Sequence, residues 1–394
     1  MSATPPLRLG AAGLGRAFMI MLPTLRAHPG VRLVAAADPR PEARAAFERE
    51  FGGRAHASVE SMCADRAVDA VYIATPHQCH VDDVIAAAAH GKHVLVEKPF
   101  GITLAQCRAM IDAARSARVA LVVGHSHSFD APYARTRALI ESGAYGEVRM
   151  IGAQYYTDFM YRPRRPEELD TSQGGGVVFS QGSHQVDVVR LLGGGRVRSV
   201  RAQCGAWDRA RGSEGAYAAL LRFEDDAFAS LVYSGYAHFD SDELAGWIGE
   251  LGARKRPGHH AATRAALASA TDEAGSKMAR AYGGAHATAA AAPVAHNHFG
   301  SIVVSCTRAD LRPLPDGIMI YDEHGARREA LDAPEVPRAE VIDELRAAAL
   351  DGRQPLHSGE WAMATLEVCL AVLESSRSGH DIDMRHQVAA PRTT

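Results

Sequence analysis

The chain has 394 residues, of which 47% are hydrophobic and 23% are charged, and its formal net charge at pH 7 is −3. This length is enough for two domains with substantial cores, and the near-neutral charge gives no electrostatic attraction to nucleic acid or to an anionic membrane. No apolar run approaches the ~20 residues of a membrane helix, the first residues do not look like a secretory signal, and the six cysteines form no C-x-x-C pair. We therefore expect a cytoplasmic protein with reduced thiols and a small-molecule substrate, and no partner nucleic acid or membrane.

The first predicted element is a short apolar strand that begins at residue 7 and runs into Gly13, Leu14 and Gly15. A helical pattern follows, starting with Arg16. Glycines at such a turn let the backbone approach a pyrophosphate, whose charge then faces the amino end of the helix. These four residues are our predicted phosphate-binding turn, although Phe18 stands where the fingerprint usually has a third glycine or an alanine.

The next predicted strand begins at Val31 and ends in Asp38. Its spacing from Gly13 suits a carboxylate that accepts hydrogen bonds from the adenosine ribose hydroxyls. A carboxylate here repels a 2′-phosphate, so NAD is favoured, while Arg40 leaves NADP open because a guanidinium can pair with that phosphate. The alternative role of Asp38 is a cap for the turn before Pro39.

Strand and helix patterns alternate over the rest of the first 125 residues. We expect strands at 70–74, 93–97 and 119–123, and helices at 41–51, 81–90 and 102–117. This alternation predicts a doubly wound parallel sheet, so residues 1–125 are interpreted as a Rossmann domain that binds NAD(P).

Polar residues follow three successive strands of this predicted sheet. They are Thr75, Pro76, His77 and His80; Glu97, Lys98 and Pro99; and His125 and His127. The carboxyl ends of parallel strands share one edge, where open α/β sheets bind ligands, so we expect the first two groups to bind the cofactor. Pro99 cannot extend the strand, which should leave Glu97 and Lys98 exposed. An ordinary solvated charge pair is the alternative.

From about residue 148 the predicted strands follow one another without helices between them. They cover 148–157, 197–206, 216–223, 228–236, 301–305 and 318–321. Such runs predict a large, mostly antiparallel sheet with the helix 177–192 on it, so residues 126–394 are assigned to an α+β domain. An alanine-rich stretch at about 252–298 is interpreted as an insertion. Two helices close the chain, and whether they return to the first domain is left open.

With Gly13–Gly15, Thr75–His80, Glu97–Pro99 and the Gly174-Gly-Gly176 run before His184, the chain resembles the glucose–fructose oxidoreductase / inositol dehydrogenase (Gfo/Idh/MocA) family. The resemblance covers nearly the whole chain apart from the insertion. It implies an α/β architecture with an NAD(P)-binding Rossmann domain and a second domain whose open sheet face forms a homodimer or homotetramer. It also implies a cis peptide before Pro99.

The family's site combines the lysine of the Glu-Lys-Pro motif with an aspartate and a histidine four residues later. Lys98 and His184 match this pattern, but Ser180 stands where the aspartate is expected; Asp187 shares the helix face with both. We predict that His184 accepts the hydroxyl proton and that Lys98 polarises the oxygen. In the alternative, Lys98 is the base and His184 orients the substrate; a histidine that only packs in the core is a further alternative.

A narrower resemblance rests on residues 155–166 and 179–185 and is to the bacterial 4,5-dihydro-4,5-dihydroxyphthalate dehydrogenases. It implies oxidation of a cis-dihydrodiol dicarboxylate to a catechol with NAD, a step of aromatic catabolism. The residues that could hold the two carboxylates are Arg162, Arg164, Arg165, His125 and His127. The alternative is an arginine cluster that is merely solvated.

Two other functions compete with this interpretation. One is a sugar- or inositol-type polyol dehydrogenase, and the other is a non-catalytic regulator that senses NAD. The presence of both Lys98 and His184 speaks against the regulator. The histidines show no fixed ligand spacing along the chain, so no metal site is expected.

Overall fold

The computed structural model describes residues 5–124, 126–287 and 292–391, and the chain divides into two compact units. The first unit comprises residues 1–125, 274–290 and 336–363, and the second comprises residues 126–273, 291–335 and 364–394. Each unit is built on one β-sheet.

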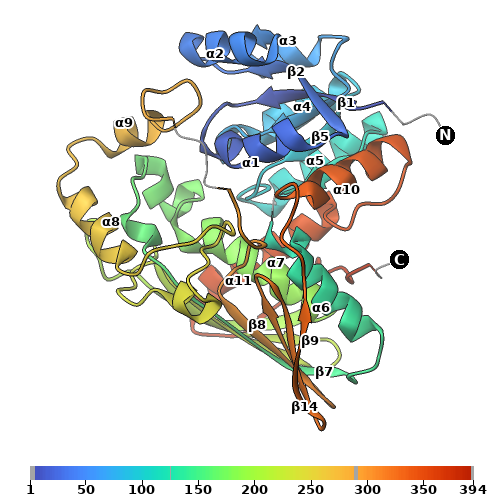
Figure 1. Ribbon diagram of the computed structural model, residues 1–394, viewed down its shortest axis with the longest axis vertical. Coiled ribbons are helices and arrows are strands. Elements are labelled where there is room, and N and C mark those ends of the chain that lie inside the picture. The colour runs from blue at the N-terminus through green and yellow to red at the C-terminus, as the bar shows by residue number, and fades with distance from the viewer. Residues whose placement is uncertain (1–4, 125, 288–291, 392–394) are drawn as a thin grey trace. The chain divides into compact units, whose positions relative to one another are not determined.

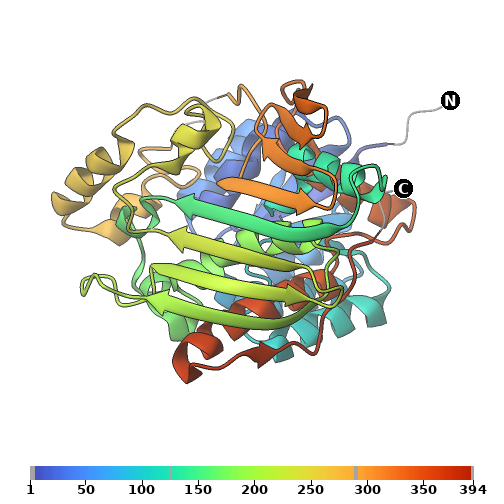
Figure 2. The same cartoon turned by 90° about the horizontal axis from the view of Figure 1, so that it is seen from below.

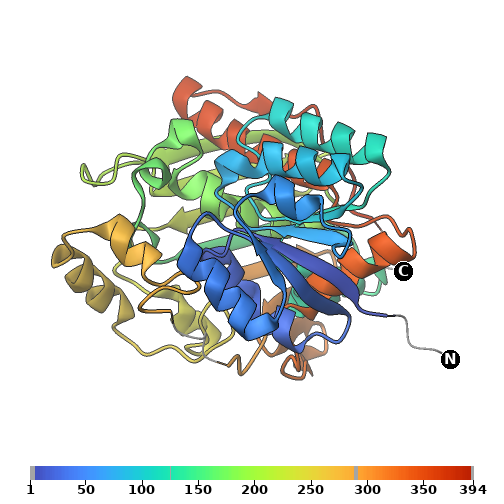
Figure 3. The ribbon, with the colours of Figure 1, turned by 90° about the horizontal axis from the view of Figure 1, so that it is seen from above.

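The sheet of the first unit has six parallel strands in the order β3-β2-β1-β4-β5-β6. The strands are β1 (Leu7–Ala12), β2 (Val31–Ala37), β3 (Arg54–His56), β4 (Ala70–Ile73), β5 (His93–Val96) and β6 (Leu121–Val123). Helices lie on both faces of this sheet, which is why its central strands are apolar on both sides (Figures 1 and 3). The strand order reverses between β1 and β4, and doubly wound sheets bind ligands at that switch point.

Local sequence features mark the ends of several helices of the first unit. They are α1 (Arg16–Ala27), α2 (Pro41–Phe51), α3 (Val59–Cys63), η1 (His77–Cys79), α4 (His80–Ala89), α5 (Leu104–Ala117) and α10 (Ala339–Leu350). Thr103 and Gln106 form a reciprocal capping box at the start of α5, and Gly52 ends α2 in the left-handed conformation. Helix α10 packs near β5 and β6, and Val123 donates a backbone hydrogen bond of 2.8 Å to His357. The segment 336–363 therefore belongs to the first unit, although it follows most of the second unit's strands in the sequence.

The sheet of the second unit has nine strands in the order β14-β13-β12-β11-β7-β10-β9-β8-β15. The strands are β7 (Val148–Tyr156), β8 (Val197–Gly205), β9 (Ala216–Phe223), β10 (Phe228–Ser234), β11 (Ser301–Cys306), β12 (Asp310–Leu314), β13 (Gly317–Asp322), β14 (Gly325–Ala330) and β15 (Ile382–Asp383). All neighbouring pairs are antiparallel except β7 and β10. Figure 2 shows β7, β10, β9 and β8 side by side, with no helix in front of them.

The helical elements of the second unit cover the other side of this sheet or form the segments between strands. They are η2 (His127–Phe129), α6 (Ala131–Glu141), η3 (Phe159–Tyr161), η4 (Pro166–Leu169), η5 (Thr171–Gln173), η6 (Val178–Gly182), α7 (Ser183–Leu192), η7 (Ser241–Ala245) and α8 (His259–Ala268). Helices α9 (Glu273–Met278) and α11 (Gly359–Ser378) cross the division between the units. Every residue of α7 after Ser183 is buried.

The predicted fold class is confirmed, because a parallel Rossmann sheet and a large, mostly antiparallel sheet are both present. The patterns missed β3, α3, α6, β12, β14 and β15. Most of these are short, and β14, with its run of exposed residues, lacks the apolar alternation that marks a strand. Helix α6 has 11 residues, but its apolar positions follow no clear helical repeat. The helix expected over 177–192 begins as a π-helical turn, η6. Among the described helices, none is both long and apolar enough to cross a membrane.

Candidate functional site

The turn between β1 and α1 has the geometry of a phosphate-binding loop. Gly13 adopts a positive φ of 83°, and a Cβ at this position would lie only 2.8 Å from the backbone nitrogen of Thr75. Only glycine fits here, for both reasons. Helix α1 follows at Arg16, with no side-chain cap from Gly15, so the amino end of the helix is at this turn. The predicted turn therefore suits a pyrophosphate.

Phe18, which departs from the glycine fingerprint, is fully buried in the first unit. Its ring meets the ring of Tyr282 edge-on, with the centroids 5.3 Å apart. The backbone nitrogen of Tyr282 also donates to the carbonyl oxygen of Leu14 at 3.2 Å. Tyr282 therefore packs against both Phe18 and the glycine turn.

Asp38 stands at the carboxyl end of β2 and is 5% exposed. One carboxylate oxygen accepts a 2.8 Å bond from the backbone nitrogen of Leu14, and the other accepts from the backbone and Nε of Arg40, both at 2.9 Å. Arg40 also donates to the carbonyl oxygens of Leu14 and Tyr282 at 2.9 and 3.3 Å. Asp38 thus joins the glycine turn to β2, and Arg40 is bound to the carboxylate. This arrangement fits a ribose-binding acid and an NAD site.

His80 connects the two loops that carry the remaining predicted cofactor residues. Its ring is fully buried, with Nε2 at 3.1 Å from the carbonyl oxygen of Thr75 and Nδ1 at 3.1 Å from that of Pro99. Burial lowers the pKa of His80 to about 4, because a charged ring would lose its water. The Thr75 hydroxyl donates to Asp83 at 2.6 Å. His80 therefore sets the positions of both loops rather than reaching outward, while Pro76 is exposed and His77 half-buried.

Glu97 and Lys98 differ from each other in burial. The expectation that Glu97 is exposed is wrong: it is buried, and Tyr72 donates a 2.6 Å hydrogen bond to its carboxylate. Burial raises the pKa of Glu97 above its usual value. Lys98 is half-buried, and the Lys98–Pro99 peptide is cis, as the family resemblance implied.

In the second unit, three ligand-type side chains converge at the start of α7. His127, His184 and Glu250 each offer one atom, and these atoms all lie within 4.8 Å of one another. The rings of His127 and His184 meet at 4.7 Å between centroids, and the Phe299 ring packs on both, at 5.1 and 5.3 Å. His127 and His184 are buried, and Glu250 is partly exposed.

A second layer of residues holds this group in place. Asp130 lies 2.7 Å from Nδ1 of His127, and Asn297 donates to the other Asp130 oxygen at 3.0 Å. Burial opposes a charge on His127, but Asp130 and Glu250 together raise its pKa above the ordinary histidine value. Glu250, Asp130 and Asn297 were not predicted. They lie on segments far apart in the sequence, and no spacing or motif marked them.

Ser180 and Asp187, the other predicted residues of this helix, are engaged in internal contacts. Ser180 sits in the π-turn η6, and its hydroxyl donates to the carbonyl oxygen of Gly176. Asp187 is buried and accepts from Ser126 at 2.5 Å and from Thr365 at 3.0 Å. The hydrogen bonds of Asp187 therefore connect α7 to the segments that carry Ser126 and Thr365.

The three predicted arginines do not share one environment. Arg162 is 38% exposed on its side chain and donates a 2.9 Å bond to buried Asp158. Partial burial disfavours its charge, but the carboxylates of Asp158 and Glu250 outweigh this effect and raise the pKa of Arg162 above its usual value. Arg164 stacks on the Phe159 ring at 3.6 Å, and burial lowers its pKa to about 10. Arg165 pairs with Glu167 in its own loop at 3.2 Å.

Tyr233 links these arginines to the rest of the unit. Its hydroxyl lies 3.3 Å from Gln181 and 2.8 Å from that of Thr157, which also accepts from the backbone nitrogen of Phe159 at 3.2 Å. The Tyr233 ring stacks with Phe299, the residue that covers both histidines. The arginines and the histidine cluster therefore belong to one polar, aromatic-walled region. His125 lies outside the described residues.

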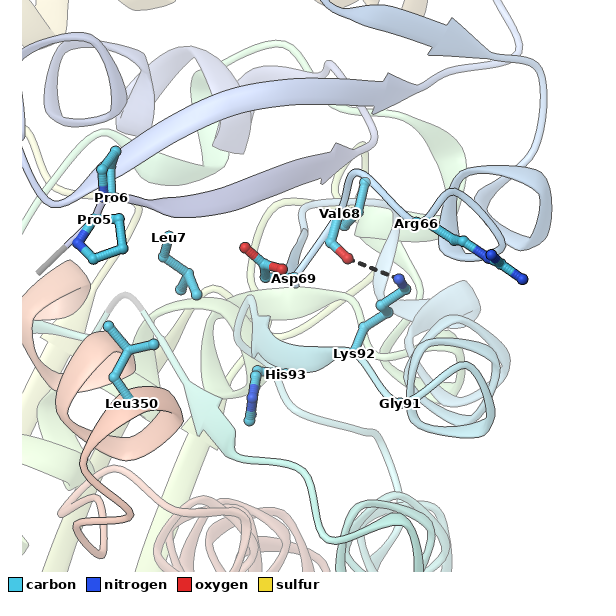
Figure 4. Close-up of a pocket in the computed structure, with 10 residues that line it drawn as sticks. All are labelled: Pro5, Pro6, Leu7, Arg66, Val68, Asp69, Gly91, Lys92, His93 and Leu350. Carbon is cyan, nitrogen blue, oxygen red and sulfur yellow. Dashed lines mark hydrogen bonds between the residues drawn. The ribbon is translucent and has the colours of Figure 1, made fainter.

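A cavity of about 500 Å³ lies in the first unit where strands β1, β4 and β5 begin, away from the carboxyl ends that carry the predicted cofactor residues (Figure 4). It is lined by Pro5, Pro6, Leu7, Arg66, Val68, Asp69, Gly91, Lys92, His93 and Leu350. Lys92 donates to the Val68 carbonyl oxygen at 2.7 Å, and Asp69 accepts from Arg8 at 2.6 Å. These strands begin here, whereas α/β sheets bind ligands where strands end, and none of the predicted site residues lines this cavity.

Comparison with known proteins agrees with this geometry. Residues 7–125 match the family model described as "Oxidoreductase family, NAD-binding Rossmann fold", and residues 133–254 match the "GFO/IDH/MocA C-terminal domain". A curated relative from Comamonas testosteroni, 1-carboxy-3-chloro-3,4-dihydroxycyclohexa-1,5-diene dehydrogenase, is 46% identical over 377 residues. The alignment covers 94% of this chain and 95% of that protein.

Solved structures show the same architecture. A protein described as a dehydrogenase from Bordetella bronchiseptica RB50 is 41% identical, with a TM-score of 0.91 over 96% of this chain and all of that one (100%). The WlbA dehydrogenase from Bordetella pertussis, solved with NADH and UDP-GlcNAcA, has a TM-score of 0.67 at 22% identity over 96% of this chain and 99% of that one. At that identity the likeness shows the fold alone.

The glycine turn at Gly13, the acid at Asp38 and the cis Lys98–Pro99 peptide occur together in one parallel sheet. The two family models match in succession along the chain. The chain therefore belongs to the Gfo/Idh/MocA family of NAD-dependent oxidoreductases.

Proposed function

We propose that the protein oxidises a cis-dihydrodiol of a carboxylated cyclohexadiene ring to the corresponding catechol. The observation that carries this proposal is a pair of guanidinium groups, Arg162 and Arg164, over the Phe159 ring at 5.8 and 3.6 Å. Phe159 is joined through Thr157 and Tyr233 to Phe299, the ring that covers His184. Guanidinium groups pair with carboxylates, and a neutral polyol has no charge to match them. The name of the relative from Comamonas testosteroni describes a carboxylated diol of this kind.

The chemistry removes a hydride from the carbon and a proton from its hydroxyl. NAD, when bound, supplies the hydride acceptor; Gly13, Gly15 and Asp38 would hold its phosphates and ribose. The ketone that forms becomes a catechol when the neighbouring CH(OH) carbon loses its C–H proton to water and the ketone oxygen takes up a proton from water. This aromatisation makes the overall oxidation strongly favourable.

We propose Lys98 and His184 for the proton step. In the first scheme, His184 accepts the hydroxyl proton while Lys98 polarises the oxygen. In the second, Lys98 accepts the proton and His184 holds the reacting oxygen. The second scheme is favoured by the neighbours of His184, because His127 and Glu250 make it one member of a ligand-type cluster rather than a lone base. Replacing Lys98 with methionine should then remove turnover at every pH, and a pH profile of activity tests this.

The substrate is tested by NAD reduction with a cis-dihydrodiol carboxylate, the same diol without a carboxylate, the dicarboxylate, myo-inositol and glucose. Arg162→Met should lower kcat/KM for the carboxylated diol roughly 100-fold, the effect of one charge-assisted contact, and leave the uncharged diol nearly unchanged. Arg165→Gln is the matched control, because Arg165 pairs with Glu167. Equal losses for both diols, or turnover of myo-inositol alone, would contradict the carboxylate assignment. No turnover of any of them would favour the NAD-sensing regulator.

The proposal also covers the assembly and location of the protein. We propose a homodimer or homotetramer that associates through the uncovered face of the second unit's sheet. Met150 and Phe228 are paired across β7 and β10, and both are exposed, as are Leu220 on β9 and Val303 on β11. A cytoplasmic location is supported by the cysteines, all six of which are free thiols.

A further inference from the structure

We propose that His127, His184 and Glu250 bind a divalent transition-metal cation, for which Zn²⁺ is the best match. The cation would hold the two vicinal hydroxyl oxygens of the substrate. This role for the cation rests on the proposed function, but the site itself is argued from the second unit alone. Two imidazoles and one carboxylate are a ligand set that Zn²⁺ and related cations prefer.

The spacing of the ligand atoms suits one cation. Nε2 of His127 lies 3.4 Å from Oε1 of Glu250, and the three ligand atoms lie within 4.8 Å of one another. Two atoms that bind one zinc ion at 2.0–2.2 Å in a tetrahedral arrangement are separated by about 3.3 Å. The His127–Glu250 pair already has this separation, and a small rotation of the His184 ring would complete the set.

The second layer of residues prepares His127 to act as a ligand. Nδ1 of His127 donates its N–H to Asp130 at 2.7 Å, which places the lone pair of the neutral ring on Nε2, toward Glu250. Asn297 holds the other oxygen of Asp130. A carboxylate behind a histidine ligand is the usual arrangement in zinc sites, since it fixes both the tautomer and the ring orientation.

The site is shielded on one side and accessible on the other. Phe299 packs on both histidine rings, and the two histidines are buried. The Glu250 side chain is 20% exposed. Three protein ligands leave at least one coordination position for substrate oxygen, as in catalytic zinc sites.

A cation at this position would decide between the two schemes for the proton step, because His184 could not then act as the base. A coordinated hydroxyl loses its proton more easily, and the lone pair of His184 is committed to the cation. The hydroxyl proton then passes to the base of the second scheme while the hydride leaves the carbon for NAD and the C=O bond forms. The cation changes neither its charge nor its oxidation state.

A proton in place of the cation is the competing arrangement. A protonated His127 would donate from Nδ1 to Asp130 and from Nε2 to Glu250, and the cluster would then need no metal. The two arrangements are separated by whether the protein binds a cation in a fixed ratio.

The test is isothermal titration of the full-length, chelator-treated protein with ZnCl₂, followed by CoCl₂ with its visible absorption. We expect one Zn²⁺ per chain and intense bands of four- or five-coordinate Co²⁺. His127→Ala and Glu250→Gln should each weaken binding roughly 100-fold or more, and Asp130→Asn about 10- to 100-fold. His324→Ala is the matched control, because His324 is strongly exposed on the β13–β14 hairpin. Far-ultraviolet circular dichroism of each variant shows whether it is folded.

Absence of stoichiometric binding by the wild type, or unchanged binding by folded His127→Ala and Glu250→Gln, would overturn the inference. The titration contains no substrate, so its outcome is separate from that of the NAD-reduction assay. Dihydrodiol oxidation at full rate by chelator-treated, zinc-free protein would overturn the cation's role and leave the proposed function standing. Zinc binding without dihydrodiol oxidation would overturn the proposed function and leave the site.

Discussion

At the scale of single residues, the partners of Arg40 decide what it can bind. Its guanidinium donates to Asp38, to the carbonyl oxygen of Leu14 and to that of Tyr282. Arg40 alone would be a ready partner for the 2′-phosphate of NADP. Because it is engaged by a carboxylate and two carbonyl oxygens, it stabilises the glycine turn, and the negative charge of Asp38 keeps the preference for NAD.

Replacing Asp38 with serine should therefore shift the cofactor preference. The substitution removes the repulsion and frees Arg40 for a phosphate, so the ratio of kcat/KM for NADP to that for NAD should rise by roughly 10-fold or more, as expected for a contact worth 1.5–3 kcal/mol. Steady-state kinetics with both cofactors measure the ratio. Asp38→Ser/Arg40→Ala is the control, and it should lose the gain with NADP. An unchanged ratio in Asp38→Ser would contradict this account of Arg40.

At the scale of elements, α7 is held by a buried polar network rather than by apolar packing alone. Asp187 accepts from Ser126 and Thr365, and Arg190 donates to the same Thr365 hydroxyl at 2.7 Å. Burial lowers the pKa of Arg190 to about 10. Removing one member takes a hydrogen bond from each of its buried neighbours, which is more costly than the loss of an exposed bond.

Asp187→Ala should destabilise the protein by about 3 kcal/mol, the range for breaking a buried charged network. Asp187→Asn keeps an acceptor oxygen and should be milder. Thermal unfolding followed by circular dichroism measures the change, and Asp226→Ala, at a highly exposed position, is the control. If Asp187→Ala unfolded at the same temperature as wild type while losing activity, Asp187 would be a substrate-binding residue, as its position in the sequence had indicated.

His80 makes the folding stability of the protein dependent on pH. The folded pKa of about 4 lies below the ordinary value of 6.5, so the unfolded chain takes up the proton more readily between these values. Stability should be complete above pH 6.5 and fall as the pH approaches 4, by about 3 kcal/mol from this residue.

His80→Gln should lose that part of the pH dependence, because an amide does not titrate. Urea unfolding at pH 7.5 and at pH 5 measures the difference, and His324→Gln is the exposed control. The same decline in both variants and in wild type would show that His80 is not responsible.

At the scale of the whole molecule, the uncovered sheet face is the feature that assembly would use. Phe228 pairs with Met150 on one side and Arg222 on the other, and Leu220 lies one pair away through Ser230. Apolar side chains on an otherwise polar, helix-free face are typical of an interface.

A charge at Phe228 should therefore break the assembly. We expect the wild type to sediment as a dimer or tetramer and Phe228→Glu to sediment as a monomer, because a buried, unpaired carboxylate is costly in an interface. Sedimentation velocity gives the mass directly. Ile85→Glu, on α4 of the first unit, is the control and should leave the assembly intact. A monomeric wild type, or an unchanged Phe228→Glu assembly, would contradict the proposed interface.

The sequence by itself determined the features that depend on neighbouring residues. The glycine turn, the acid at the end of β2, the Lys98–Pro99 motif and the alternation of strand and helix are local patterns with local physical causes. From them follow the Rossmann sheet, the mostly antiparallel second sheet, the family and the preference for NAD, together with the expectation that His184 is functional.

Only the tertiary structure decided which side chains meet. Glu97, expected at the surface, is buried against Tyr72, and the carboxylate of Asp187 faces hydroxyls of the core. His127 and His184 are joined by Glu250, which no motif marks. These outcomes depend on contacts between segments far apart in the chain, and periodicity and spacing describe only the segment in which they occur.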